Sequence, residues 1–144
     1  MITASASTPS QAAPDFRDGL LHFGAVPAAC AGLCRTPVIR EGLQLCASKQ
    51  SGHPGGFASA ADAYAALVML GHTNIVTEVG HHAPGFYSAM FLDGSLEAMG
   101  IRTVTELQDR FRERDGLLGH LSGAIPGLRA PAGPLGQGQP FAMA

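Results

Sequence analysis

Gly133-Pro134-Leu135-Gly136-Gln137-Gly138 is the segment from which we infer the fold class. Its three glycines allow the backbone to adopt positive φ angles and to approach a ligand closely. The residues that follow, Pro140-Phe141-Ala142-Met143-Ala144, have the character of a helix that is just beginning. A helix this short does not persist alone, because the cost of nucleation is not recovered. The chain is therefore expected either to be a fragment or to have the rest of its domain supplied by another polypeptide.

The composition is that of one small domain. The chain has 144 residues, of which 46% are hydrophobic and 14% are charged, and it contains no tryptophan. This length and content suffice for a small core. Residues 1–15 are rich in small residues and proline and show no periodicity, so we expect a flexible tail there and a domain over residues 16–144.

Charge and hydropathy argue against two classes of partner. The formal net charge is -2 and Lys49 is the single lysine, whereas nucleic-acid binding needs a basic surface. No stretch is long and apolar enough to span a bilayer. The first residues lack the basic start and the apolar run of a signal peptide. We therefore expect neither nucleic acid nor a membrane as a partner, and a cytoplasmic location.

The cysteines and histidines do not show metal-binding spacing. Cys30-Ala-Gly-Leu-Cys34 is not the CxxC of a zinc or redox site. Cys30, Cys34 and Cys46 are expected to be reduced thiols, two of them on or near a buried helix face. The histidines lack the short HxxxH interval with which zinc is often bound. No metal-ligating residue is predicted in this chain.

Periodicity predicts a helix that begins near Pro37 and continues to about Lys49. Proline is favoured in the first turn of a helix, where its missing N–H costs nothing. Ile39, Leu43 and Cys46 fall at helical spacing and are predicted to form the apolar face.

Further elements follow from breakers and capping signals. Ser51-Gly52-His53-Pro54-Gly55-Gly56 ends the first helix, and an alanine-rich helix is predicted from about Ser59 to Leu70. Residues 81–91 are expected to form a loop that passes into a helix. Thr103-Val104-Thr105-Glu106 has the form of a capping box and predicts a helix that continues to about Arg114.

The best strand candidate is Asn74-Ile75-Val76-Thr77-Glu78-Val79, which is short, β-branched and followed by Gly80. One strand among several helices is too little sheet for an independent α/β domain. We therefore predict an α/β fold class in a partial form, helix-rich with few parallel strands, that another chain completes.

Histidine placement indicates a candidate site. Three of the six histidines, His53, His81 and His120, each follow a glycine in a loop rich in helix breakers. Such loops are where a site displays an imidazole to a ligand. For any single one the alternative is a solvated loop histidine, but the repeated setting favours a site. Whether His82, next to His81, takes part stays open.

These motifs, taken in order, resemble the N-terminal part of the transketolase family of thiamine diphosphate enzymes. The segments that are similar to the family's four cofactor-loop motifs are Ser51–Gly56 with the alanine-rich helix after it, Gly80-His81 with Tyr87-Ser88, Gly119-His120, and Gly133–Gly138. The resemblance covers roughly Val38 to Ala144. Residues 80–87 with residues 91–94 are closer to the related homodimeric pyruvate dehydrogenase decarboxylating component.

The resemblance implies roles for these residues. His53 and His120 would be the catalytic groups, facing the thiazolium ring and the oxygens of the substrate and steering protons. His53 would also contact the cofactor, and His81 would lie against its diphosphate. The segment Gly133-Pro134-Leu135-Gly136 would approach the cofactor, with Leu135 in the apolar wall around the thiazolium. The implied reaction transfers or joins a two-carbon or acyl unit between keto and aldehyde compounds.

Two parts of the family pattern are absent from this sequence. One is the Gly-Asp-Gly motif with a later asparagine, which holds magnesium on the diphosphate. The other is the pyrimidine-binding domain with its activating glutamate. The resemblance thus implies thiamine diphosphate and Mg²⁺ as cofactors and a second polypeptide that carries both missing parts, including the metal ligands. The expected function is that of the first polypeptide of a split transketolase-like enzyme. The alternatives are a non-catalytic binding or regulatory module derived from the same scaffold, and a truncated fragment.

Overall fold

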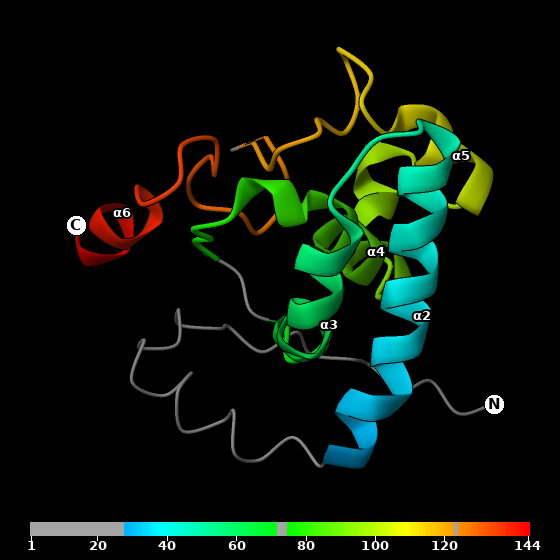
Figure 1. Ribbon diagram of the computed structural model, residues 1–144, viewed down its shortest axis with the longest axis horizontal. Coiled ribbons are helices and arrows are strands. Elements are labelled where there is room, and N and C mark those ends of the chain that lie inside the picture. Colours follow the sequence, from blue (N-terminus) through cyan, green and yellow to red (C-terminus); the bar gives the residue numbers. More distant parts are fainter. Residues whose placement is uncertain (1–27, 72–74, 123) are drawn as a thin grey trace, which may run out of the picture.

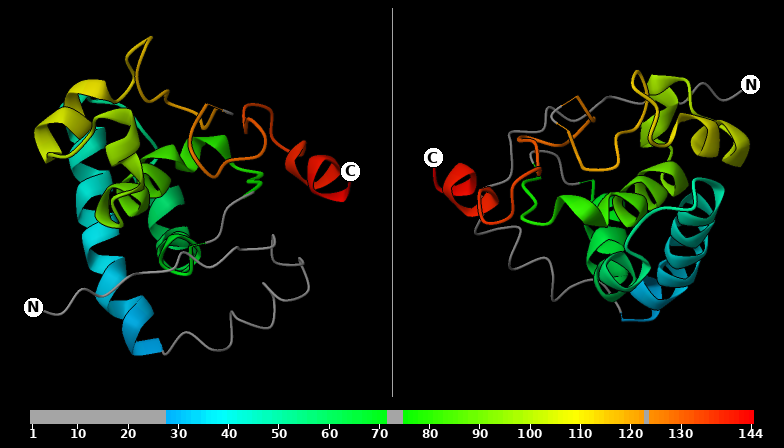
Figure 2. Two further views of the ribbon diagram at one scale, coloured as in Figure 1. Left: turned by 180° about the vertical axis from the view of Figure 1, so that it is seen from behind. Right: turned by 45° about the horizontal axis from the view of Figure 1, so that its top comes forward.

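The computed structural model describes residues 28–71, 75–122 and 124–144, and the tail predicted over residues 1–15 lies outside them. The helices are α2 (Ala28–Ser48), α3 (Pro54–Met69), η1 (Gly80–His82, 3₁₀), α4 (Ala83–Leu92), η2 (Ser95–Met99, 3₁₀), α5 (Val104–Arg110) and α6 (Gly138–Met143). α2, α3 and α4 all pack against one another (Figure 1). From there the last segment of the chain extends to α6, which lies at the side of the molecule opposite α2 in every view (Figures 1 and 2).

Helix α2 is longer than predicted. It begins at Ala28, so Pro37 lies inside the helix and the prediction that this proline occupies the first turn is wrong. The residues before Pro37 are largely alanine and other small or apolar residues, whose helix propensity extends the helix toward the N-terminus despite the proline.

The buried face of α2 also differs from the prediction. Cys46 is buried as expected, together with Val38 and Leu45. Leu43, which was expected to face the core, has 46% of its surface exposed. The side of the helix that packs is therefore rotated from the predicted one, and the reason lies in its contact with α3.

Phe57 of α3 is the point at which the three packed helices meet. Its side chain is fully buried, at 0% exposure. A Cβ atom on Gly42 of α2 would lie 2.6 Å from ring atom Cε2 of Phe57, and one on Gly85 of α4 would lie 2.8 Å from the Phe57 Cβ. Both neighbouring helices can approach Phe57 this closely only because glycine stands at these two positions. The contact fixes the first turn of α3, and with it His53.

The predicted strand over residues 74–79 is wrong in its described part. Of residues 75–79, Ile75 alone pairs, in an isolated parallel bridge with Leu128. Leu128 follows Pro126 and Gly127, which give the bridge no regular strand to extend along. The helix-rich character of the predicted fold class is confirmed, but the described residues contain isolated bridges rather than parallel strands.

The capping box at the start of α5 is confirmed. The Thr103 hydroxyl accepts from the amide of Glu106 at 3.2 Å, and the Glu106 carboxylate accepts from the amide of Thr103 at 2.9 Å. The helix ends at Arg110 instead of continuing to Arg114. The cause is a turn in which Arg112 has a positive φ of 60° and donates its amide to the Leu117 carbonyl at 2.6 Å.

The helices and the cysteines can be compared with the expectations from composition. Among the described residues, no helix has the length and apolar character needed to cross a membrane. Cys46 is a free thiol on the buried face of α2. The side chains of Cys30 and Cys34 are not among those described.

Glu41 of α2 is a buried carboxylate with incomplete hydrogen bonding. Its side chain is 5% exposed and its Oε1 accepts from Nε of Arg40 at 2.9 Å. Within the described residues its Oε2 has no hydrogen-bond partner. A buried polar atom left unpaired costs about 1–3 kcal/mol.

We expect Glu41→Met to raise the free energy of unfolding by about 1–3 kcal/mol, because the substitution removes the unpaired oxygen and keeps the helix propensity. Chemical denaturation followed by circular dichroism measures this change. Glu97→Met, at an exposed acid, is the matched control and should change stability little. A loss of stability in Glu41→Met would contradict the assignment of an unpaired oxygen.

Candidate functional site

Three histidines from two separate loops form one group, which we call the histidine cluster: His53, His81 and His82. The ring centroids of His53 and His81 are 4.9 Å apart, as are those of His81 and His82. His53 precedes the first residue of α3, and the other two belong to η1. The first two of the predicted loop motifs are thus in contact.

The turn that presents His53 requires glycine. Gly52 has a φ of 149°, and a Cβ atom on it would lie 2.2 Å from Sγ of Cys46. The amide of Ser51 donates to the Cys46 carbonyl at 2.9 Å, which closes the end of α2. The chain therefore folds back over the Cys46 thiol before α3 begins, and His53 is left exposed at the start of that helix.

Gly56, in the first turn of α3, lies against the other two rings of the histidine cluster. A Cβ atom there would be 2.8 Å from Nε2 of His82 and 3.4 Å from Cδ2 of His81. The second glycine of Gly55-Gly56 thus allows η1 to pack on α3. Gly55 itself has no atom within 4 Å of the position of a Cβ, so its backbone is open.

His82 is held by a residue that the sequence did not single out as functional. The hydroxyl of Tyr64, from α3, lies 2.9 Å from Nδ1 of His82. Tyr64 is 7% exposed, and burial raises the pKa of its phenol. Burial lowers the pKa of His82, and the charges of His81 and His53 add to this effect. Nearby imidazoles disfavour a further positive charge.

The third predicted motif, Gly119-His120, lies next to Gly80, the first residue of η1. A Cβ atom on Gly80 would lie 2.8 Å from Cδ2 of His120 and 1.7 Å from the carbonyl oxygen of Ala132. Ala132 is in turn held by its amide, which donates to the Leu121 carbonyl at 2.9 Å. His120 therefore lies beside η1. Because Ala132 contacts Gly80, the Gly133–Gly138 segment that follows it begins beside η1 as well.

The far end of the Gly133–Gly138 segment is fixed by Glu78. The Glu78 carboxylate accepts from the amides of Gly138 and Gln139, at 3.1 and 2.7 Å. A carboxylate is favourable at this end of α6, where amides are otherwise unpaired. The sequence placed Glu78 in a predicted strand, and this role was missed, although an acid two residues before Gly80-His81 was visible.

Between these two attachments the candidate cofactor-binding residues Gly133, Pro134, Leu135 and Gly136 are exposed. Leu135 has 74% of its surface exposed, and a Cβ on Gly133 or Gly136 would meet no atom within 4 Å. The structure thus brings the segment beside η1 but gives it no described contact with the rings of the histidine cluster.

Arg112 joins the loop that leads to His120 with the loop that carries His53. Its Nη1 donates to the hydroxyl of Ser51. A Cβ on Gly119 would be 2.7 Å from Nε of Arg112, so the guanidinium lies directly on that glycine. Burial raises the pKa of Cys46, and the charge of Arg112 and the amide of His53 oppose this rise. A guanidinium is therefore present beside the histidine loops.

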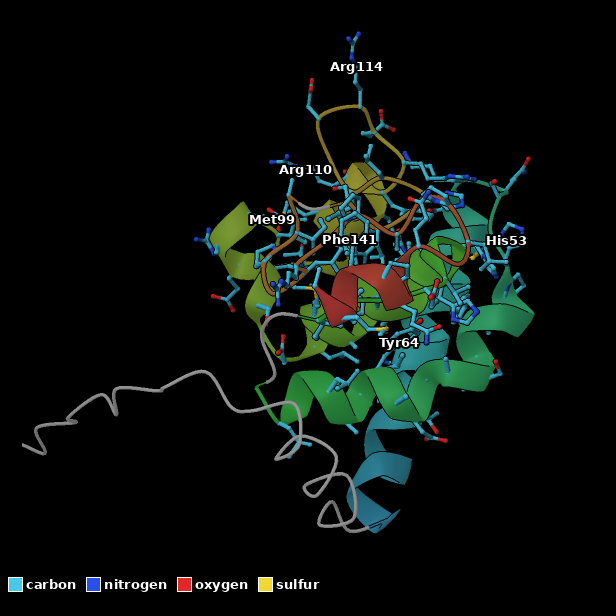
Figure 3. The ribbon with its side chains drawn as sticks, turned by 90° about the vertical axis from the view of Figure 1, so that its left-hand side faces the viewer. His53, Tyr64, Met99, Arg110, Arg114 and Phe141 are labelled. Atoms are coloured by element: carbon cyan, nitrogen blue, oxygen red, sulfur yellow. The ribbon has the colours of Figure 1, made fainter. Side chains whose placement is uncertain are left out.

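Figure 3 views the molecule from the side of α6, with Phe141 on that helix and with Tyr64 and His53 also labelled. In the part of the chain that is described, no group of three or more His, Cys, Asp or Glu side chains is arranged to hold a metal ion. The backbone is open at Gly55 and Gly133, and the imidazoles of His53 and His120 are exposed.

No protein-family model, no curated protein and no solved structure matches this chain. The resemblance to transketolases therefore depends on the four sequence motifs alone.

We expect Gly80→Ala to lower the free energy of unfolding by at least about 1–3 kcal/mol, the range for overpacking, because the new Cβ would collide with the Ala132 carbonyl. Urea denaturation measures the loss, and limited proteolysis should show new cleavage after Ala132. Gly55→Ala is the matched control, since its Cβ meets no atom within 4 Å, and it should not destabilise the protein. Equal stability of the two variants would contradict the close contact at Gly80.

Proposed function

We propose that this chain is one component of a split, transketolase-like enzyme that binds thiamine diphosphate and transfers or joins a two-carbon or acyl unit between keto and aldehyde compounds. The observation that carries the proposal is the meeting of all four motif segments on residues 77–82. His53 and Gly56 contact the two histidines of η1, His120 and Ala132 contact Gly80, and Gly138 is bound by Glu78. Segments separated by tens of residues converge in this way where a fold builds a ligand site.

The open backbone positions and the exposed imidazoles support thiamine diphosphate as the ligand. His81 would bind its diphosphate, and Gly133, Pro134, Leu135 and Gly136 would contact the rest of the cofactor. When bound, the cofactor supplies a nucleophilic carbon and an electron sink for cleavage or formation of a C–C bond. His53 and His120 would move protons on and off the substrate oxygens, a task for which imidazole is suited near neutral pH.

A second polypeptide would supply the magnesium ligands and the pyrimidine-binding domain. Exposed apolar side chains in the Gly133–Gly138 segment and in α6 support such a partner. Leu135, Phe141 and Met143 are 74%, 47% and 80% exposed. Exposed apolar side chains grouped beside a site are typical of an interface. With a net charge of -2, this partner is a protein rather than a nucleic acid, and we propose a cytoplasmic location for the complex.

The test is calorimetric titration of thiamine diphosphate with Mg²⁺ into the chain, alone and in complex with the product of an adjacent reading frame that contains the Gly-Asp-Gly motif. We expect tight binding in the complex only. His81→Ala should weaken binding in the complex by about tenfold or more, which corresponds to about 1.4 kcal/mol, because it removes a contact to the diphosphate.

His120→Ala is the matched variant for this titration. It should leave cofactor affinity within about threefold and lower turnover instead, because its expected contact is with substrate oxygens. A folded complex that binds no thiamine diphosphate would overturn the proposal and leave a binding or regulatory module.

A further inference from the structure

The hydroxyl of Tyr64, from α3, lies 2.9 Å from Nδ1 of His82 in the histidine cluster. Tyr64 and His82 also meet edge to face, with ring centroids 6.0 Å apart. None of these contacts involves the residues to which the proposed function assigns chemistry.

The direction of the hydrogen bond between Tyr64 and His82 follows from the proton of the phenol. The phenol keeps its proton, because burial raises its pKa. That proton needs an acceptor, and the atom within reach is Nδ1 of His82. An imidazole whose Nδ1 accepts a hydrogen bond is neutral and carries its proton on Nε2.

We propose that Tyr64 is a positioning residue that fixes His82 as the neutral Nε2–H tautomer, so that a proton taken up by the histidine cluster is carried by His81 or His53. The groups that face His82 are Tyr64 from α3, His81 from η1 and His53 from the loop before α3. None of them is an acid that would stabilise a charge on His82.

Fixing His82 has a consequence for its neighbours. A second charged imidazole with its centroid 4.9 Å from His81 would make protonation of His81 less favourable. A neutral His82 removes that repulsion. If the proposed function holds, this device favours charge on His81, the residue assigned to the diphosphate, but the tautomer itself does not depend on that function.

The test is ¹⁵N long-range correlation spectroscopy of the imidazoles in the full chain, recorded over about pH 5 to 8, the range in which histidine titrates. It distinguishes the two neutral tautomers and the charged form for each histidine. We expect His82 to show the single Nε2–H tautomer and to take up a proton at a lower pH than an ordinary histidine. No cofactor is needed, so a failure of thiamine diphosphate to bind would not affect the result.

Tyr64→Phe keeps the ring and removes the hydroxyl. We expect His82 in this variant to become a mixture of tautomers and to protonate at a higher pH than in the wild type, because Nδ1 no longer accepts the phenol proton. Tyr87→Phe is the matched control, since the hydroxyl of Tyr87 donates to the Leu118 carbonyl away from the histidine cluster.

Two results would overturn the proposal. One is an Nδ1–H tautomer for His82 in the wild-type protein, which would mean that the imidazole donates to Tyr64. The other is a Tyr64→Phe variant, folded as judged by its remaining amide spectrum, in which the tautomer and the titration of His82 are unchanged. The first result is available from the wild type alone, even if Tyr64→Phe does not fold.

Discussion

The carbonyl oxygen of Ala132 and the ring of His120 both lie against Gly80, at positions that leave no room for a Cβ atom. This close approach holds the irregular second half of the chain against the helical first half. On one side of it, η1 packs on the first turn of α3 through His82 and Gly56. On the other, Glu78 binds the amides at the start of α6. Residues 77–82 are thus the point from which every candidate site segment is positioned.

Packing of α2, α3 and α4 fixes the positions of the loop that carries His53 and of η1. Gly42 and Gly85 allow α2 and α4 to close on Phe57, which fixes the beginning of α3 and the loop that carries His53. α4 continues directly from η1, and its residues from Ala83 to Met90 are all buried. The loops that carry His53 and His81 therefore adjoin elements whose position is set by packing.

Local signals predicted the elements that have a local cause. The capping box at Thr103 and the end of α2 before Ser51 were readable because hydroxyl, carboxylate and glycine act within a few residues. The start of the next helix was predicted too late, near Ser59, whereas α3 begins at Pro54, inside the predicted break. The strand over residues 74–79 was wrong because β-branched residues form a strand only where a neighbouring strand exists, and Ile75 finds a single partner residue.

The same distinction applies to the candidate site. Glycine beside histidine was enough to select His53, His81 and His120. Three further residues make the hydrogen bonds around them: Tyr64 with His82, Glu78 with Gly138 and Arg112 with Ser51, each pair distant in sequence. No local pattern in the sequence pairs Tyr64 with His82.

Nuclear Overhauser spectroscopy on the labelled protein tests whether the loops converge on residues 77–82. Cross-peaks are expected between the ring protons of His53 and His81, and between Hδ2 of His120 and the α-protons of Gly80. The edge-to-face pair of Tyr64 and Phe86, with centroids 5.6 Å apart, serves as the internal reference. If the reference pair gives its cross-peaks while both histidine contacts are missing, the loops do not converge on residues 77–82.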